Sequence, residues 1–275
     1  MRNITLRPII LAQTVVTMLM TPSCAPNRAK QAESIYDEAI NAFSAKKTER
    51  AKMLIDSLRT YYADIPTTYH LARDLSRLIC RYEAERTVAF LDSSLAVIEA
   101  KQREMLKEMA VDDPAASTPV YIAKGQLAWK SYNRCYLKAR ADANGLFSIT
   151  SNFVGEKAIH HDHIVVSCGD EYVKTTVVTD GVCKNSFTDD EYTWETLRYE
   201  GSDAADLARF IASNADNRIV VQYLGPHAHY VSVMTDVDKQ AVSQVWELSC
   251  VLRESLRIRT MIRSARIEMT RSATH

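Results

Sequence analysis

The sequence predicts an α+β protein in which a β-rich domain is inserted between long helices. Apolar residues recur every three or four positions up to about residue 109, every second position from 117 to 235, and with the helical period again from 236. Seven glycines and seven prolines in 275 residues favour long helices over turn-rich architectures. We expect a leader at 1–23, a helical hairpin and long coiled-coil helix at 24–112, a β-rich head at 117–235, and a C-terminal helix at 236–272.

The first 23 residues have the features of a signal peptide. Two arginines precede the uncharged apolar run Pro8 to Met20, which is too short to span about 30 Å of hydrocarbon as a helix. A serine stands directly before Cys24, as at the cleavage site of a bacterial lipoprotein, although Thr21 replaces the usual leucine. The sequence favours lipidation of Cys24 over an ordinary secretory signal in which this cysteine is incidental.

The remaining composition narrows the classes of function. Lysine plus arginine and aspartate plus glutamate number 34 each, so nothing global indicates nucleic-acid binding. No C-x-x-C pattern occurs among the cysteines, which excludes zinc-ribbon and thioredoxin-like sites. Cys168 and Cys183 either form a disulfide in an oxidising compartment or remain free thiols.

The helical segments need partners for their apolar faces. Residues 28–62 predict two short antiparallel helices, similar to a single tetratricopeptide-type pair, which cannot bury a core alone. The helices at 68–109 and 236–269 carry narrow stripes, so we expect an antiparallel coiled-coil stalk with the β-domain inserted at its tip. The expected seam residues on the first helix are Leu71, Leu75, Leu78 and Tyr82, followed after a phase shift by Leu91, Leu95, Ile98, Gln102, Met105 and Met109. Those on the second helix are Val242, Val245, Leu248, Leu252, Leu256 and Ile262.

The last helix is rich in arginine. We expect these side chains to pair with acids on the partner helix; gripping anionic lipid headgroups is the alternative. The arginines are Arg253, Arg257, Arg259, Arg263, Arg266 and Arg271, and the expected partners are Glu83, Glu85, Glu99, Glu104 and Glu108.

The central segment predicts strands. Asn144-Gly145 between two alternating runs is a strong hairpin signal. A short helix is expected at Asp203 to Asn214 with Ser202 as its N-cap. Aromatic residues in this segment form a ligand or glycan platform if exposed and the domain core if buried; alternating strands favour the core. They are Trp129, Tyr132, Tyr136, Tyr192, Trp194, Tyr199 and Tyr223.

Four histidines are the candidate metal ligands. Residues two apart on a strand share a face, so His161 with His163 and His227 with His229 would supply four imidazoles to one zinc if their strands were neighbours. Gly225-Pro226 before the second pair indicates a turn, which favours surface histidines without metal. No H-E-x-x-H, G-x-S-x-G, P-loop or G-x-G-x-x-G motif is present.

Several segments resemble a group of Bacteroidota-type lipoproteins of unassigned activity, with a coiled-coil stalk and an inserted β-domain. They include E-R-T-V-A-F-L-D-S-S-L, Y-L-K-A-R-A-D-A-N-G-L-F-S-I-T-S, A-I-H-H-D-H-I-V-V-S and A-R-F-I-A-S-N-A-D-N-R-I-V-V-Q-Y-L-G. The resemblance covers most of the chain after Cys24 and implies lipidation and an envelope location. The residues after Cys24 (A-P-N-R) lack the acidic run associated with surface display, which favours the periplasmic side of the outer membrane.

We therefore expect a non-catalytic structural or binding protein, held to a membrane by lipid on Cys24 and requiring no cofactor. The helical stalk is the expected surface for a protein partner. A zinc-binding protein or zinc enzyme is the alternative, and a homo-oligomer formed through the coiled coil is a third possibility.

Overall fold

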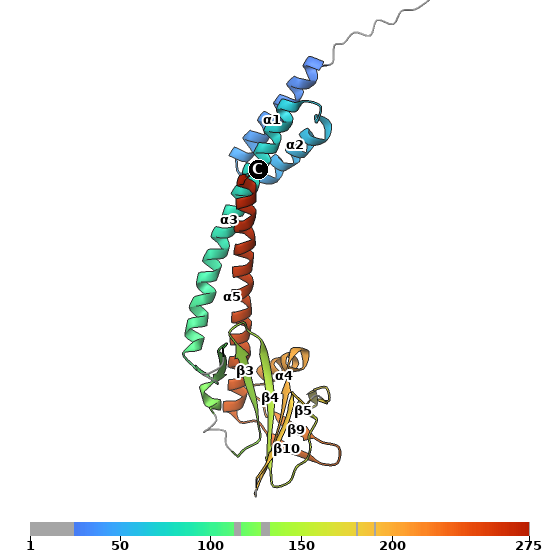
Figure 1. Cartoon of the computed structure of the whole chain (residues 1–275), viewed down its shortest axis with the longest axis vertical. Coiled ribbons are helices and arrows are strands. Elements are labelled where there is room, and N and C mark those ends of the chain that lie inside the picture. Colours follow the sequence, from blue (N-terminus) through green and yellow to red (C-terminus); the bar gives the residue numbers. More distant parts are fainter. Residues whose placement is uncertain (1–24, 113–116, 128–132, 180, 190, 275) are drawn as a thin grey trace, which may run out of the picture. The chain divides into compact units, whose positions relative to one another are not determined.

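The computed structural model describes residues 25–112, 117–127, 133–179, 181–189 and 191–274, and within them the α+β class is confirmed (Figure 1). The described residues divide into two compact units: 25–83 with 269–274, and those between 84 and 268. The helices are α1 (Ala25–Ser44), α2 (Thr48–Tyr61), α3 (Pro66–Leu106), α4 (Gly201–Ser213) and α5 (Asp236–Thr274). The strands are β1 (Met109–Val111), β2 (Val120–Ala123), β3 (Tyr136–Asp142), β4 (Phe147–Gly155), β5 (His163–Cys168), β6 (Glu171–Lys174), β7 (Lys184–Thr188), β8 (Thr193–Tyr199), β9 (Val220–Leu224) and β10 (His229–Val233).

The first unit is built on the predicted helix pair. Lys46, with φ of 60°, lies in the turn between α1 and α2. Buried alanines on both helices allow their backbones to approach closely. The helix pair also packs against α3, whose Leu75 and Ile79 belong to the same core. The Phe43 and Tyr82 rings meet edge-to-face, with centroids 5.6 Å apart.

In the second unit, α3 and α5 pair antiparallel and run side by side in Figure 1. Arg266 lies 3.3 Å from Asp92, and Arg259 lies 2.7 Å from Glu99. Asp92 and Glu99 are seven residues apart on α3, and their partners Arg266 and Arg259 are seven residues apart in the opposite direction on α5. The two helices are therefore antiparallel in this register. Buried Leu91, Ile258 and Ile262 form the apolar contact.

The predicted seam was wrong at Leu71 and Leu78 on α3, which are 42% and 57% exposed. Met109 lies in β1, beyond the end of α3. The seam was also wrong at Leu256 on α5, which is 48% exposed. Ser255 and Ile258 are buried there instead. Ser255 stands one heptad after Leu248 and one before Ile262, so helix geometry, not hydrophobicity, decides which side chain faces α3.

The predicted arginine pairing holds in part. Arg259 and Arg266 reach α3, but Arg257 pairs with Glu254 on its own helix, and Arg253 lies over the Trp246 ring at 5.2 Å. Two of the expected partners are engaged elsewhere: Glu83 with Lys52 and Glu104 with Lys107. These local pairs form because residues three apart on a helix, or on packed neighbouring helices, lie within reach of each other.

Two antiparallel sheets make up the β-rich part of the second unit. Among the described strands, sheet A has the order β1-β2-β3-β4-β8-β7 and sheet B has β10-β9-β5-β6. Alternate residues of both sheets point into one core shared with α4 and α5, which contains Ile149, Leu197, Tyr223, Leu207 and Val245. The Asn144-Gly145 hairpin between β3 and β4 is confirmed.

The N-cap prediction for α4 was wrong. The helix begins at Gly201, and Glu200 takes the capping position without a side-chain hydrogen bond. Ser202 therefore lies inside the first turn. Gly201 has a φ of 60°, so a left-handed turn leads the chain into the helix, and glycine adopts such angles without steric cost.

Candidate functional site

His161 is completely buried in the core of the second unit, and both of its ring nitrogens have partners. Its Nδ1 lies 2.8 Å from Glu195 Oε2, and its Nε2 lies 3.0 Å from Ser151 Oγ. Ser151 and Glu195 come from the inward face of neighbouring strands, β4 and β8. The imidazole therefore ties the segment before β5 to sheet A.

The carboxylate of Glu195 also holds the backbone of this segment. It accepts the N–H groups of His160 at 2.8 Å and His161 at 2.9 Å. The φ of 54° at His160 turns the chain so that both N–H groups face one carboxylate. Burial by itself raises the pKa of Glu195, but the hydrogen bonds from the His161 ring and from these two N–H groups lower it to about 2.

An ionised Glu195 carries no proton, so the Nδ1–H of His161 is the donor in their hydrogen bond. In the tautomer with the proton on Nδ1 alone, Nε2 accepts from the hydroxyl of Ser151. This Ser–His–Glu order is the one found in serine hydrolases. However, Ser151 and His161 are 0% exposed, and Phe153 and Tyr223 pack around the imidazole with ring centroids at 6.1 and 5.6 Å.

Two buried tyrosines adjoin this cluster. The hydroxyls of Tyr199 and Tyr223 are the buried side-chain atoms without a hydrogen-bond partner in the described part of the chain. Burial raises the pKa of Tyr199 to about 12, against the lowering effect of the neighbouring Thr175 and Ser151 hydroxyls. Burial also raises the pKa of Tyr223 well above its ordinary value. Both groups are therefore neutral phenols at physiological pH.

The other candidate histidines lie elsewhere. The expected shared face of His161 and His163 does not occur, because β5 begins only at His163, and this residue contacts Asp162 through Nδ1 at 2.6 Å. His163 and His229 pair with opposite sides of Leu224, so β9 separates them and their backbones lie about 10 Å apart. His227 is exposed in the turn before β10. Within the described ranges, no three His, Cys, Asp or Glu side chains are placed to hold one metal ion.

The cysteine predictions have different outcomes. Cys168 and Cys183 are free thiols, not a disulfide. Cys24, the predicted lipidation site, lies outside the described residues.

The aromatic residues divide between core and surface. Tyr199 and Tyr223 are buried, as predicted for alternating strands. Tyr192 and Trp194 lie on the outward face of sheet A, and Arg134 covers the ring of Tyr136 at 4.5 Å. Trp129 and Tyr132 lie outside the described residues.

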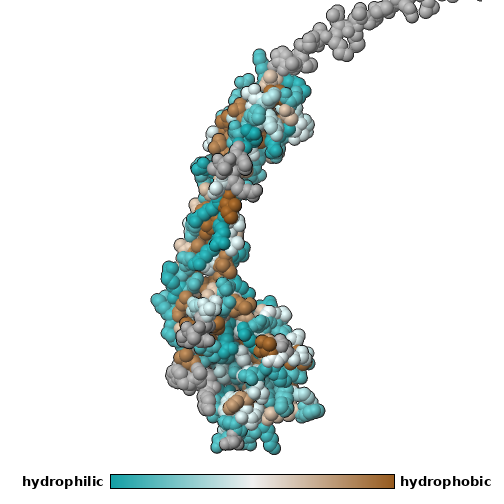
Figure 2. All heavy atoms as spheres, viewed as in Figure 1, coloured by the Kyte–Doolittle hydropathy of each residue, from teal (hydrophilic) through white to brown (hydrophobic). Residues whose placement is uncertain are grey.

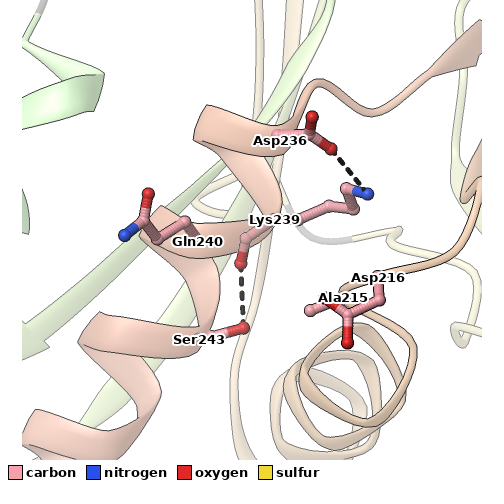
Figure 3. Close-up of a pocket in the computed structure, with 6 residues that line it drawn as sticks. All are labelled: Ala215, Asp216, Asp236, Lys239, Gln240 and Ser243. Atoms are coloured by element: carbon pink, nitrogen blue, oxygen red, sulfur yellow. Dashed lines mark hydrogen bonds and ion pairs between the residues drawn. The ribbon is translucent and has the colours of Figure 1, made fainter.

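A polar cavity of about 450 Å³ lies at the N-terminal turn of α5 (Figure 3). Lys239 is its central group, and its Nζ lies 2.8 Å from Asp236 and donates to the carbonyl of Asn217 at 2.9 Å. Ser243 donates to the Lys239 carbonyl at 2.9 Å. The ammonium and the hydroxyl are thus both engaged in holding the helix start in place.

The visible surface of the molecule is mostly hydrophilic, with hydrophobic atoms in small groups (Figure 2). No described helix combines the length and apolar character needed to cross a bilayer. The chain matches no family model, no curated protein and no solved structure. The lipoprotein resemblance therefore remains a prediction from the residues.

Proposed function

We propose that the protein is a lipid-anchored component of the cell envelope whose β-rich part binds a ligand or a protein and performs no catalysis. The anchor would be lipid on Cys24, and the proposed site of action is the periplasmic side of the outer membrane. The leader pattern of residues 1–23 supports the anchor. The pairing of α3 with α5 supports a helical stalk attached to the β-rich part.

The burial of the Ser151–His161–Glu195 cluster is the main support for the proposal that the protein performs no catalysis. A nucleophile must meet its substrate, and Ser151 Oγ has no exposed surface. The cluster instead makes four hydrogen bonds that hold residues 160 and 161 against sheet A.

The anchor is tested by labelling cells that express the protein with tritiated palmitate. We expect label on the wild type, loss of label in Cys24→Ser, and retention in Cys80→Ser, which replaces an exposed free cysteine. An unlabelled wild type, or a labelled Cys24→Ser variant, would overturn the proposed anchoring.

A serine hydrolase is the second candidate, favoured by the 3.0 Å and 2.8 Å distances within the cluster. It requires a rearrangement that exposes Ser151. Covalent labelling of the wild type by a fluorophosphonate probe, lost in Ser151→Ala, would establish this candidate. An unlabelled wild type would remove it.

The alternative that the protein binds zinc can also be tested directly. Zinc titration of the wild type beside the double variant His161→Ala/His163→Ala distinguishes a real site, which the variant loses, from weak binding common to both. Sedimentation across a range of concentrations tests self-association through the coiled coil.

A further inference from the structure

We infer that the outward face of strands β4, β8 and β7 binds a neutral, pyranose-based oligosaccharide. Phe187, Tyr192 and Trp194 form the stacking surface, named here the aromatic platform, and a row of amide and hydroxyl side chains beside it recognises the sugar hydroxyls. This inference rests on the proposed binding function and names its ligand class.

The platform is built by strand pairing. Phe187 on β7 stands directly opposite Trp194 on β8, with ring centroids 5.7 Å apart and ring planes inclined by 38°. Tyr192 lies two residues before Trp194, on the same face, with centroids 6.1 Å apart. Phe187 is 62% exposed and Tyr192 is 36% exposed, so these two rings are open to a ligand, and Trp194 is half-buried beside them. The intervening Thr193 and Glu195 point into the core.

The polar row lies two residues along the same strands, at about 7 Å from the rings. It is formed by Asn185, Thr196 and Asn152, which are directly opposite one another on β7, β8 and β4. Asn152 Nδ2 donates to two backbone carbonyls, which leaves its side-chain oxygen as the acceptor for a ligand. In the described contacts, the Asn185 amide and the Thr196 hydroxyl form no hydrogen bond with another side chain.

The charge distribution argues for a neutral ligand. Neither row contains a charged side chain. The cations next to the polar row are compensated: Arg198 pairs with Glu200 at 2.7 Å, and Lys138 pairs with Asp112 at 2.5 Å. At the other end of the platform, Asp189 accepts the backbone N–H groups of Glu191 and Tyr192. An acidic ligand would find no uncompensated cation there. A sugar ring combines an apolar face for the aromatic side chains with hydroxyls at its edge for the amides.

The test uses isothermal titration of the purified protein with two probes, N-acetylchitotetraose and cellotetraose. The variants are Phe187→Ala and Asn185→Ala. The matched control is Tyr172→Ala, because Tyr172 is a similarly exposed aromatic residue (67%) on an edge strand of the other sheet. We expect the wild type to bind at least one probe, Phe187→Ala to bind it about tenfold more weakly, and Tyr172→Ala to match the wild type. Unfolding curves confirm that each variant is folded.

Absence of binding to both probes would overturn the inference, as would equal affinities of Phe187→Ala and the wild type. Loss of affinity in Tyr172→Ala matching that in Phe187→Ala would also overturn it. Palmitate labelling of the same proteins separates the two proposals. A labelled protein that binds neither sugar loses the glycan inference alone, whereas an unlabelled wild type loses the proposed anchoring whatever its sugar affinity.

Discussion

His161 and Glu195 are joined at 2.8 Å through Nδ1 and Oε2 in a part of the core where their side chains are 0% and 4% exposed. The same carboxylate binds two backbone N–H groups. This pair accounts for the burial of His161, the most buried histidine of the motif I-H-H-D-H.

Replacing Glu195 by glutamine keeps the shape but leaves one acceptor oxygen where the carboxylate offered two. We expect the free energy of unfolding to fall by about 2–3 kcal/mol, because buried N–H donors lose their partner. Urea denaturation followed by circular dichroism measures this loss. Glu191→Gln, in the exposed turn before β8, is the control and should change little. Equal losses in both variants would contradict the structural role of the cluster.

The pH dependence of the free energy of unfolding should reflect the ionisation of Glu195. Its pKa falls from an ordinary 4.5 to about 2 on folding. A lowered pKa stabilises the folded state fully above about pH 4.5, and this contribution, on the order of 3 kcal/mol, is lost as the pH falls towards 2. Urea midpoints at about pH 7 and about pH 3 should differ more for the wild type than for Glu195→Gln. The prediction fails if the two proteins lose stability in parallel.

Asp238 links the start of α5 to the β-strands. It accepts hydrogen bonds from Gln126 at 3.0 Å, Arg134 at 2.8 Å and Thr235 at 2.7 Å. The backbone N–H of Asp238 in turn donates to the Thr235 hydroxyl, so Thr235 caps the first turn of α5.

We expect Asp238→Ala to lower the free energy of unfolding by about 3–5 kcal/mol, because removal of a buried carboxylate leaves its guanidinium and amide partners unsatisfied. Asp236→Ala, two residues away and 96% exposed, should cost less than about 1 kcal/mol. Thermal and urea unfolding of the two variants give the comparison. Similar losses would mean that helix capping charge, not the buried network, dominates.

Gly145 places the β3–β4 hairpin against α5. Its φ is 80°, and a Cβ atom there would lie 2.6 Å from the backbone oxygen of Ser249. Gly169, with φ of 58° and no atom within 4 Å of such a Cβ, has the strained conformation without the contact.

Gly169→Ala should therefore cost about 1–2 kcal/mol from backbone strain alone. Gly145→Ala adds a steric clash with the backbone of α5 and should lower the free energy of unfolding clearly more. The difference between the two variants in urea denaturation gives the contribution of this contact. If the two glycines prove equivalent, the hairpin does not pack tightly on α5.

The sequence determined the elements with a strong local signal. The helix pair, the two long helices and the Asn144-Gly145 hairpin follow from periodicity and turn chemistry, which act over a few residues. Local signals did not predict the structure correctly where the position of a residue on its helix or strand outweighs its hydrophobicity. The heptad placed Ser255 in the seam and left Leu256 exposed, and the short strands β1, β2 and β7 had no periodic signal of their own.

Only the tertiary structure decided the candidate sites. Ser151, His161 and Glu195 are separated by 10 and 34 residues, and no spacing in the chain marks them as partners. Strand pairing brings Ser151 and Glu195 onto one inward face, and the left-handed turn at His160 directs the imidazole between them. The sequence supplied the histidines and the aromatic residues. The pleat and order of the strands decided which of them are buried and which are open to a ligand, because side-chain direction depends on sheet register.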